Sequence, residues 1–157
     1  GCNKMAEVEK MTVEKAAEFL GQGFHCSQCV IGYGADKLGL DKDLMLQVSG
    51  GLGGGCFHGD VCGAVSGAIM AISAKYGYHT PEGAKMNNAK MVEKLQEFET
   101  KFKERYGTIV CRELLGGYSF SNPEHAQKIM TEGLTKNCPG YCAGACEILD
   151  EILKDEE

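Results

Sequence analysis

The chain has 157 residues, enough for one domain that buries about two-thirds of the surface exposed by its unfolded form. Its formal net charge of −6 comes with no run of lysine or arginine, which argues against binding to nucleic acid or to an anionic membrane. No apolar stretch approaches the roughly eighteen residues of a membrane span, and the start lacks the apolar core of a signal peptide. We therefore expect one domain over residues 1–157, with residues 154–157 as an acidic tail.

Apolar side chains recur with a helical period in the first third of the chain. Thr12 is a suitable cap for a helix over residues 13–20, which then stops at a pair of glycines. A second helix is predicted from Cys26 to Leu38, ending at Gly39. Asp41 then caps a short third helix. All three predicted segments have a start signal, an apolar face and a stop signal.

The second half of the chain repeats this pattern. Thr80-Pro81 is a cap followed by proline at the first helical position, and an apolar stripe continues from it to Tyr106. Asn122-Pro123 gives the same start signal, and residues 145–152 form the apolar face of a last helix. No segment alternates with a period of two for long enough to be a strand. The expected fold class is all-α, a compact single-domain helical bundle.

The centre of this bundle is predicted to be a helix from about Cys62 to Tyr76, capped by Asp60. Gly67 costs about 1 kcal/mol there relative to alanine. Gly63, Gly67 and Ala71 lie four residues apart and so share one smooth face, where a neighbouring helix can approach closely.

A glycine-rich stretch precedes this helix at residues 50–55. It lacks the Gly-Lys-Ser/Thr ending of a phosphate-binding loop, and no predicted strand leads into it. We interpret it instead as a turn that lets the backbone pass close to a bound group. The candidate cofactor-binding glycines are Gly53, Gly54, Gly55 and Gly63.

Nine cysteines are a high count for a chain of this size, and the number is odd. An odd count without a visible secretory signal favours thiols kept for metal binding or redox chemistry over a disulfide framework. We therefore expect a reducing, cytoplasmic location and mostly free or metal-bound thiols.

Four of these cysteines occupy predicted helix starts: Cys26, Cys62, Cys111 and Cys138. Unpaired backbone N–H groups and the positive end of the helix dipole favour the thiolate at such positions. If the helix starts converge, the four thiols form a site suited to an iron–sulfur cluster. The alternative is that each cysteine is a small buried hydrophobic residue.

The other cysteines leave more than one interpretation open. Cys29, Cys56 and Cys142 are alternative ligands, members of a second thiol pair or core residues, and Cys146 shares a helix face with Cys142. Cys2 is expected to lie outside the site. His25 and His58 adjoin these cysteines as ligands, hydrogen-bond donors or exposed loop residues. The absence of C-x-x-C-H excludes c-type haem, and the paired C-x-x-C motifs of a zinc ribbon are also missing.

The order of Cys26, the run Cys62-Gly63-Ala64-Val65-Ser66-Gly67, Cys111 and Cys138 resembles the redox-active family named for the pattern C_GCAxxG_C_C. The resemblance spans about residues 16–149 and includes residues 50–55, 75–77 and 111–116. A domain similar to this family accompanies haem segments in split-Soret cytochromes, which implies electron transfer through an iron–sulfur centre. This chain lacks a haem segment and departs from the family pattern by its additional cysteines.

Three functions follow from these patterns. The first is electron transfer through a cluster of undetermined type, with an electron donor or acceptor protein as partner. The second is thiol–disulfide or peroxide chemistry, in which Cys62 attacks as a low-pKa thiolate and Cys56 resolves the mixed disulfide. The third is a structural zinc protein. A homodimer is an alternative to the monomer in each case.

Overall fold

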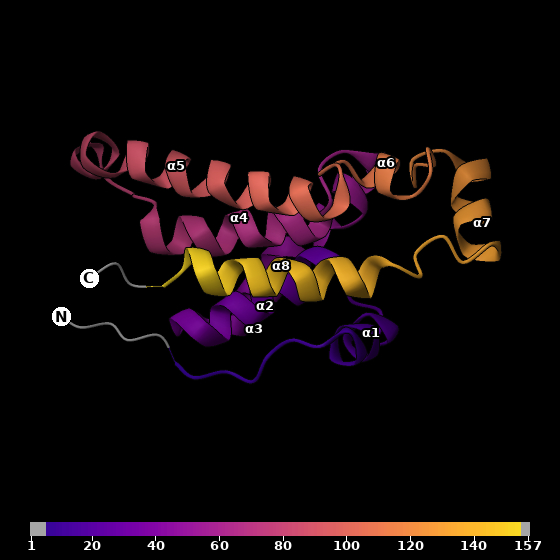
Figure 1. Cartoon of the computed structure of the whole chain (residues 1–157), viewed down its shortest axis with the longest axis horizontal. Helices are drawn as coiled ribbons and strands as arrows, with labels where there is room; N and C mark the ends of the chain where they lie inside the picture. The colour runs from indigo at the N-terminus through magenta and orange to yellow at the C-terminus, as the bar shows by residue number, and fades with distance from the viewer. Residues whose placement is uncertain (1–5, 155–157) are drawn as a thin grey trace.

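A computed structural model describes residues 6–154. These residues form eight α-helices and two short helical turns, and their one β-type pairing is an isolated antiparallel bridge between Val61 and Val110 (Figure 1). The predicted all-α class is confirmed. Cys2 and the end of the predicted acidic tail lie outside the described residues.

The elements follow one another in this order: α1 (Val13–Gly21), α2 (Cys26–Leu38), α3 (Lys42–Ser49), η1 (Gly50–Leu52), η2 (Gly55–Gly59), α4 (Gly63–Tyr76), α5 (Pro81–Tyr106), α6 (Cys111–Leu114), α7 (Pro123–Thr131) and α8 (Cys138–Ile152).

Most of the predicted helix starts are confirmed by their capping bonds. The side chains of Thr12, Asp41, Thr80 and Asn122 each accept a hydrogen bond from a backbone N–H two or three residues further on. These bonds satisfy donors that the first turn of a helix leaves unpaired.

The predicted cap of α4 is wrong. Cys62, not Asp60, occupies the cap position, and its side chain makes no capping bond. The reason lies in the backbone of Asp60, whose N–H donates to the Gly55 carbonyl and whose carbonyl accepts from the Cys111 N–H at 2.6 Å. Residues 60–62 are thereby held against residues 109–111, and the helix begins only after them.

The predicted smooth face of α4 is confirmed, and its partner is α2. A Cβ added to Gly67 would lie 2.5 Å from the carbonyl oxygen of Ser27, and one added to Gly34 would lie 2.7 Å from the Cβ of Ala71. The start of α2 therefore meets the start of α4, and the later parts of the two helices also meet. The two helices run parallel in close contact, and α4 is buried along most of its length.

Helix α8 runs in the same direction as α2 and α4. The Tyr76 hydroxyl and the Lys75 amine at the end of α4 donate to backbone carbonyls at the end of α8. The long helix α5 runs the opposite way, since Lys101 pairs with Glu151 at 2.8 Å, and Arg105, further along α5, pairs with Glu147, earlier in α8, at 2.9 Å. The amino-terminal ends of α2, α4 and α8 therefore gather at one end of the bundle.

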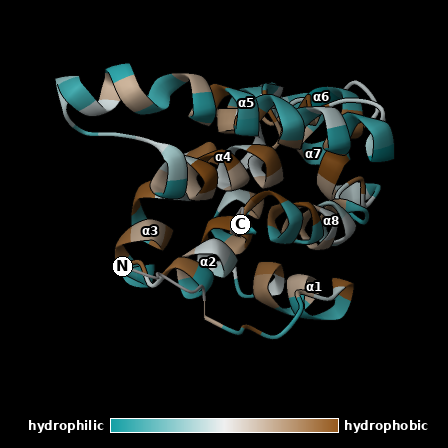
Figure 2. Cartoon of the chain, turned by 60° about the vertical axis from the view of Figure 1, so that its left-hand side comes forward, coloured by the Kyte–Doolittle hydropathy of each residue, from teal (hydrophilic) through white to brown (hydrophobic). Residues whose placement is uncertain are grey.

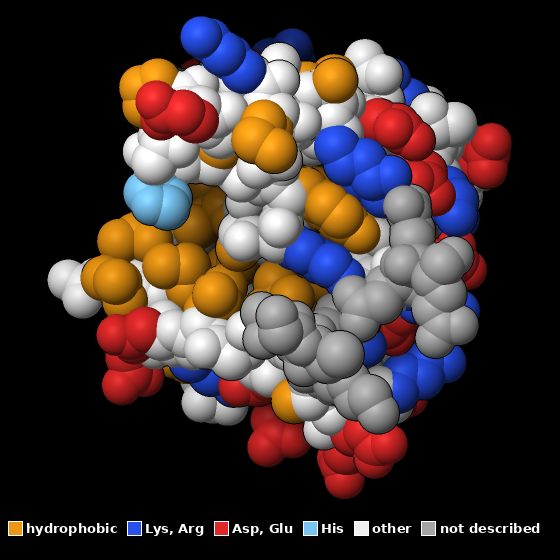
Figure 3. All heavy atoms as spheres, turned by 90° about the vertical axis from the view of Figure 1, so that its left-hand side faces the viewer, with side chains coloured by type: hydrophobic (Ala, Val, Ile, Leu, Met, Phe, Trp, Pro, Cys, Tyr) orange, Lys and Arg blue, Asp and Glu red, His pale blue; other side chains and the backbone are white. Residues whose placement is uncertain are grey.

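The core lies between these three parallel helices. Figure 2 shows hydrophobic ribbon on α2, α4 and α8, whereas much of α5, which packs against α4 and α8, is hydrophilic. On the face in Figure 3, hydrophobic side chains gather in a hollow at the left, and acidic and basic side chains lie side by side on the right. Within residues 6–154, no helix combines the length and apolar character needed to cross a membrane.

Candidate functional site: a cysteine-lined cavity

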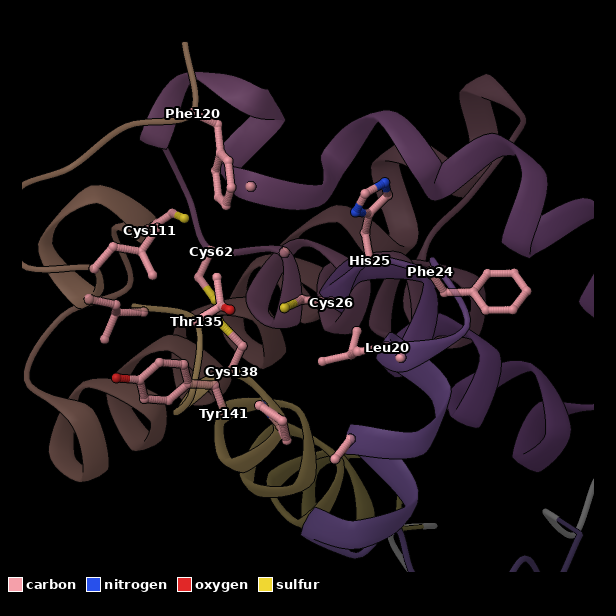
Figure 4. A pocket seen from close by; sticks show the side chains of 17 residues that line it. Leu20, Phe24, His25, Cys26, Cys62, Cys111, Phe120, Thr135, Cys138 and Tyr141 are labelled. Atoms are coloured by element: carbon pink, nitrogen blue, oxygen red, sulfur yellow. The ribbon is translucent and has the colours of Figure 1, made fainter. Parts of the chain in front are cut away.

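A cavity of about 380 Å³ opens where the starts of α2, α4, α6 and α8 meet. Its wall includes Cys26, Cys62, Cys111 and Cys138 (Figure 4). These are the four cysteines that the sequence places at helix starts. The structure brings them together although they are spread over more than a hundred residues of chain.

The short backbone pairing outside the helices joins Cys62 to Cys111. The N–H of Cys62 donates to the Ile109 carbonyl at 2.7 Å, and the N–H of Cys111 donates to the Asp60 carbonyl at 2.6 Å. Two segments of the cavity wall are thus held by main-chain hydrogen bonds. Their relative position does not depend on side-chain packing alone.

A glycine allows Cys26 to approach Cys62. A Cβ added to Gly63 would lie 2.9 Å from the backbone nitrogen of Ser27 and 3.1 Å from the Cβ of Cys26. Gly63 also lines the cavity. Any side chain at this position would push α2 away from the start of α4 and move the two thiols apart.

Negative charge in the cavity is favoured at Cys26. The pKa of Cys26 lies well below its ordinary value, chiefly because the neighbouring thiols of Cys138 and Cys142 stabilise its charged form. The interaction of Cys138 with Cys26, together with burial, raises the pKa of Cys138. Hydrogen bonding to a thiolate stabilises the charged form and opposes ionisation of the donor.

The other two cavity thiols are protonated in the absence of a cation. Burial, with the charge of Cys26 nearby, raises the pKa of Cys62 to about 12 and that of Cys111 to about 11. The expectation of a low-pKa thiolate at Cys62 is therefore not supported, because burial outweighs the helix-start effect there. Among the four cavity thiols, the charged form is favoured most at Cys26.

The glycine-rich stretch reaches the cavity at one point only. Gly54 lines it, whereas Gly53 packs under His25, where an added Cβ would lie 2.5 Å from the Cβ of His25. Gly55 has φ +62°, and an added Cβ would lie 2.4 Å from the Asp60 nitrogen. Gly53 and Gly55 are thus required by packing and by the turn itself.

Cys56 is exposed and is not part of the cavity wall. It follows Gly55 in a left-handed turn in which Cys56 and Phe57 have φ of 59° and 57°. His58 is likewise absent from the cavity wall, whereas His25 forms part of it.

The three remaining described cysteines, Cys29, Cys142 and Cys146, are buried. Cys142 lies behind the wall, with its sulfur 4.0 Å from the carbonyl oxygen of Cys26. Cys29 faces a second cavity of about 180 Å³. All eight described cysteines are free of disulfide bonds.

Sequence patterns did not identify the apolar part of the cavity wall. Leu20, Phe24, Phe120 and Tyr141 surround the four thiols (Figure 4). Tyr141 lies three residues after Cys138 and so shares its helix face, a signal that the sequence contained. Phe120 follows α6 in an irregular segment, for which no periodicity exists.

Within residues 6–154, no three His, Cys, Asp or Glu side chains already stand in a metal-binding arrangement. The four thiols share the wall of one cavity and the electrostatic interactions described above.

The fold and the cavity define an all-helical protein whose thiols converge at the starts of four helices. Residues 24–152 match the family model described as "Putative redox-active protein (C_GCAxxG_C_C)", and the chain belongs to this family. No curated protein and no solved structure matches the chain.

Proposed function

We propose that this protein transfers electrons through an iron–sulfur cluster held in the cavity by Cys26, Cys62, Cys111 and Cys138. One observation carries the proposal, namely that four thiols from four separate helix starts line a single cavity of about 380 Å³. Packing alone has no need to bring four cysteines to one wall. When bound, such a cluster would supply one-electron chemistry.

The electrostatics of the cavity favour an occupant that contains cations. Three of the four thiols have a raised pKa, and negative charge on neighbouring sulfurs contributes to each increase. Iron would remove this mutual repulsion and allow all four sulfurs to bind as thiolates. The backbone N–H groups of Ala64 and Val65 at the start of α4 already lie against the Cys62 sulfur and would stabilise it as a ligand.

The apolar wall also suits this role. Leu20, Phe24, Phe120 and Tyr141 place apolar side chains in the wall around the thiols. A restricted, apolar surrounding protects a cluster from solvent and influences its redox properties. An electron donor or acceptor protein is the expected partner. A reducing cytoplasm suits thiols of this kind.

Anaerobic purification followed by iron, acid-labile sulfide and zinc analysis tests this proposal. We expect iron and sulfide in the protein and a visible absorption that bleaches on reduction. Cys62→Ser should lose most of the iron while the far-ultraviolet helical signal is retained, because a core of this size does not depend on the metal. Cys146→Ser is the matched control, since Cys146 is equally buried but lies outside the cavity.

If the purified protein contains zinc but no iron, the cavity is a structural zinc site and the proposed cluster is wrong. Metal-free protein with its four cavity thiols intact would contradict both. That result would favour the second candidate, thiol–disulfide exchange, because the neighbouring Cys138 thiol stabilises the charged form of Cys26. In that case Cys26 is the nucleophile and Cys138 the resolving thiol, in place of the pair Cys62 and Cys56.

A further inference from the structure

Tyr106, the last residue of α5, contacts the first turns of α8 in two ways. Its hydroxyl donates a hydrogen bond to the Gly140 carbonyl at 3.2 Å, and its ring meets the ring of Tyr141 edge-on, with 4.9 Å between the ring centroids. Tyr141 and Cys138 lie in the wall of the first cavity (Figure 4). Tyr106 is not part of that wall, but both of its contacts lie within three residues of a cavity thiol.

Gly144 makes room for this hydroxyl. A Cβ added to Gly144 would overlap the hydroxyl oxygen of Tyr106 and would lie 2.9 Å from its Cζ. Gly140 and Gly144 are four residues apart on one face of α8, so the hydroxyl enters a gap between two turns of the helix. A glycine inside a helix is unfavourable relative to alanine. The contact with Tyr106 gives a reason for this one.

The chain after Tyr106 leads directly into another part of the cavity wall. The segment 109–111, which ends at Cys111, is hydrogen-bonded along its backbone to residues 60–62. The main chain of Tyr106 thus continues to one cavity thiol, and its side chain contacts the helix that begins with a second one, Cys138.

We propose that Tyr106 is a positioning residue for the Cys138 sulfur. It joins the start of α8 to the segment that carries Cys111 and so sets the separation of these two thiols. The importance of this placement for electron transfer rests on the proposed cluster, because a bound group needs its ligands at fixed positions. The placement itself can be measured without any metal.

Tyr76 offers a matched control at the opposite end of α8. Its hydroxyl donates to the Ile152 carbonyl at 3.1 Å, and like Tyr106 it is partly buried. Phenylalanine at either position removes one hydroxyl that bonds a carbonyl of α8 and keeps the ring. The two variants should therefore lose similar stability, but only Tyr106→Phe should loosen the end of α8 that carries Cys138.

The test measures the rate at which iodoacetamide alkylates Cys138 in reduced, full-length protein freed of metal, under native conditions. Fragment ions distinguish Cys138 from Cys142 and Cys146, which share its tryptic peptide. We expect Tyr106→Phe to raise the rate roughly fivefold, the factor that corresponds to one hydrogen bond in a local opening equilibrium. Tyr76→Phe should leave the rate near that of the unmodified sequence.

Gly144→Ala tests the same contact from the side of α8. The new methyl group would displace the Tyr106 hydroxyl, so the rate at Cys138 should rise as it does in Tyr106→Phe. Gly140→Ala is the control for this variant and should leave the rate unchanged, because no atom lies within 4 Å of an added Cβ there.

Equal rates at Cys138 in Tyr106→Phe and Tyr76→Phe, whether both raised or both unchanged, would overturn the proposal. If Gly144→Ala does not fold, as judged by its helical signal, the comparison of the two tyrosine variants still decides the question.

A second measurement applies when the purified protein contains the proposed cluster. Iron should then pass to a chelator faster from Tyr106→Phe than from Tyr76→Phe, because one ligand is held less firmly. Equal iron loss from the two variants would contradict the role of Tyr106 at the cluster. Protein without iron would refute the cluster alone, and the alkylation rates would still decide whether Tyr106 positions Cys138.

Discussion

The hydroxyl of Tyr33 donates a 2.7 Å hydrogen bond to the carboxylate of Asp150, which lies 117 residues further along the chain. Lys37 forms an ion pair with the same carboxylate. These contacts join α2 to the later part of α8 and set the register of the two parallel helices. Since Cys26 and Cys138 begin the same two helices, the contacts at Asp150 help to place both thiols in one cavity.

Tyr33→Phe should therefore destabilise the protein. The substitution removes the hydroxyl and keeps the ring, so we expect a loss of about 1 kcal/mol in the free energy of unfolding, measured by urea denaturation. Tyr78→Phe is the control, because Tyr78 is exposed and bonds Asn88 at 2.8 Å on the surface. Equal effects of the two substitutions would argue that the Tyr33–Asp150 bond has no special role in joining the helices.

Gly67→Ala should loosen the contact between α2 and α4. The new methyl group would lie 2.5 Å from the carbonyl oxygen of Ser27, a backbone atom that cannot move alone. We expect a loss of about 1–3 kcal/mol in unfolding free energy. Gly21→Ala is the control, since no atom lies within 4 Å of an added Cβ there. A stability gain for Gly67→Ala would contradict the close packing of these helices.

The alkylation rates of two cavity thiols should depend differently on pH in reduced protein freed of metal. The pKa of Cys26 is lowered, so its rate should reach its plateau at a lower pH than that of an ordinary thiol. Burial raises the pKa of Cys111 to about 11, so its rate should increase about tenfold per pH unit up to that value. Iodoacetamide labelling with peptide mapping measures both, and parallel profiles would contradict the assignment of the charge to Cys26.

Cys56→Gly should stabilise the loop before α4. Cys56 has φ 59°, which disfavours an L-residue by about 1–2 kcal/mol, whereas glycine adopts this conformation readily. We expect a net gain of about 0.5–1 kcal/mol in unfolding free energy, after the entropic cost of glycine. Cys56→Ala is the control and should give no such gain. If the proposed cluster is present, both variants should retain it, because Cys56 lies outside the cavity wall; its loss in both would return Cys56 to the candidate ligands.

The local signals of the sequence were sufficient for most of the helices. Capping side chains such as Thr80, and stop signals such as Gly39 with its φ of +69°, act within one or two turns and can be read from neighbouring residues. The smooth face of α4 was also readable, because Gly67 has no local reason to be in a helix. The partner of this face, α2, could not be predicted, because a smooth face indicates that some helix packs closely but does not identify that helix.

The site was only partly predictable, because local signals do not reveal contacts between distant segments. Helix-start positions identified Cys26, Cys62, Cys111 and Cys138, but the charge distribution among them depends on burial and on contacts between distant segments. The predicted cap at Asp60 is wrong because the Asp60 carbonyl accepts a hydrogen bond from the N–H of Cys111, a residue about fifty positions away. The opening of Cys29 onto a separate cavity likewise depends on residues of α1 and the segment before it.

The shared direction of α2, α4 and α8 has an energetic consequence for any group that changes charge in the first cavity. Three positive helix ends meet at the cavity, while the carboxyl end of α1, whose Leu20 and Gly21 lie in the wall, opposes them in part. A centre that gains an electron there becomes more negative, and this field stabilises it more after the gain than before. The starts of α2, α4 and α8 therefore act to raise the reduction potential of a redox group in the cavity, and the end of α1 acts against them.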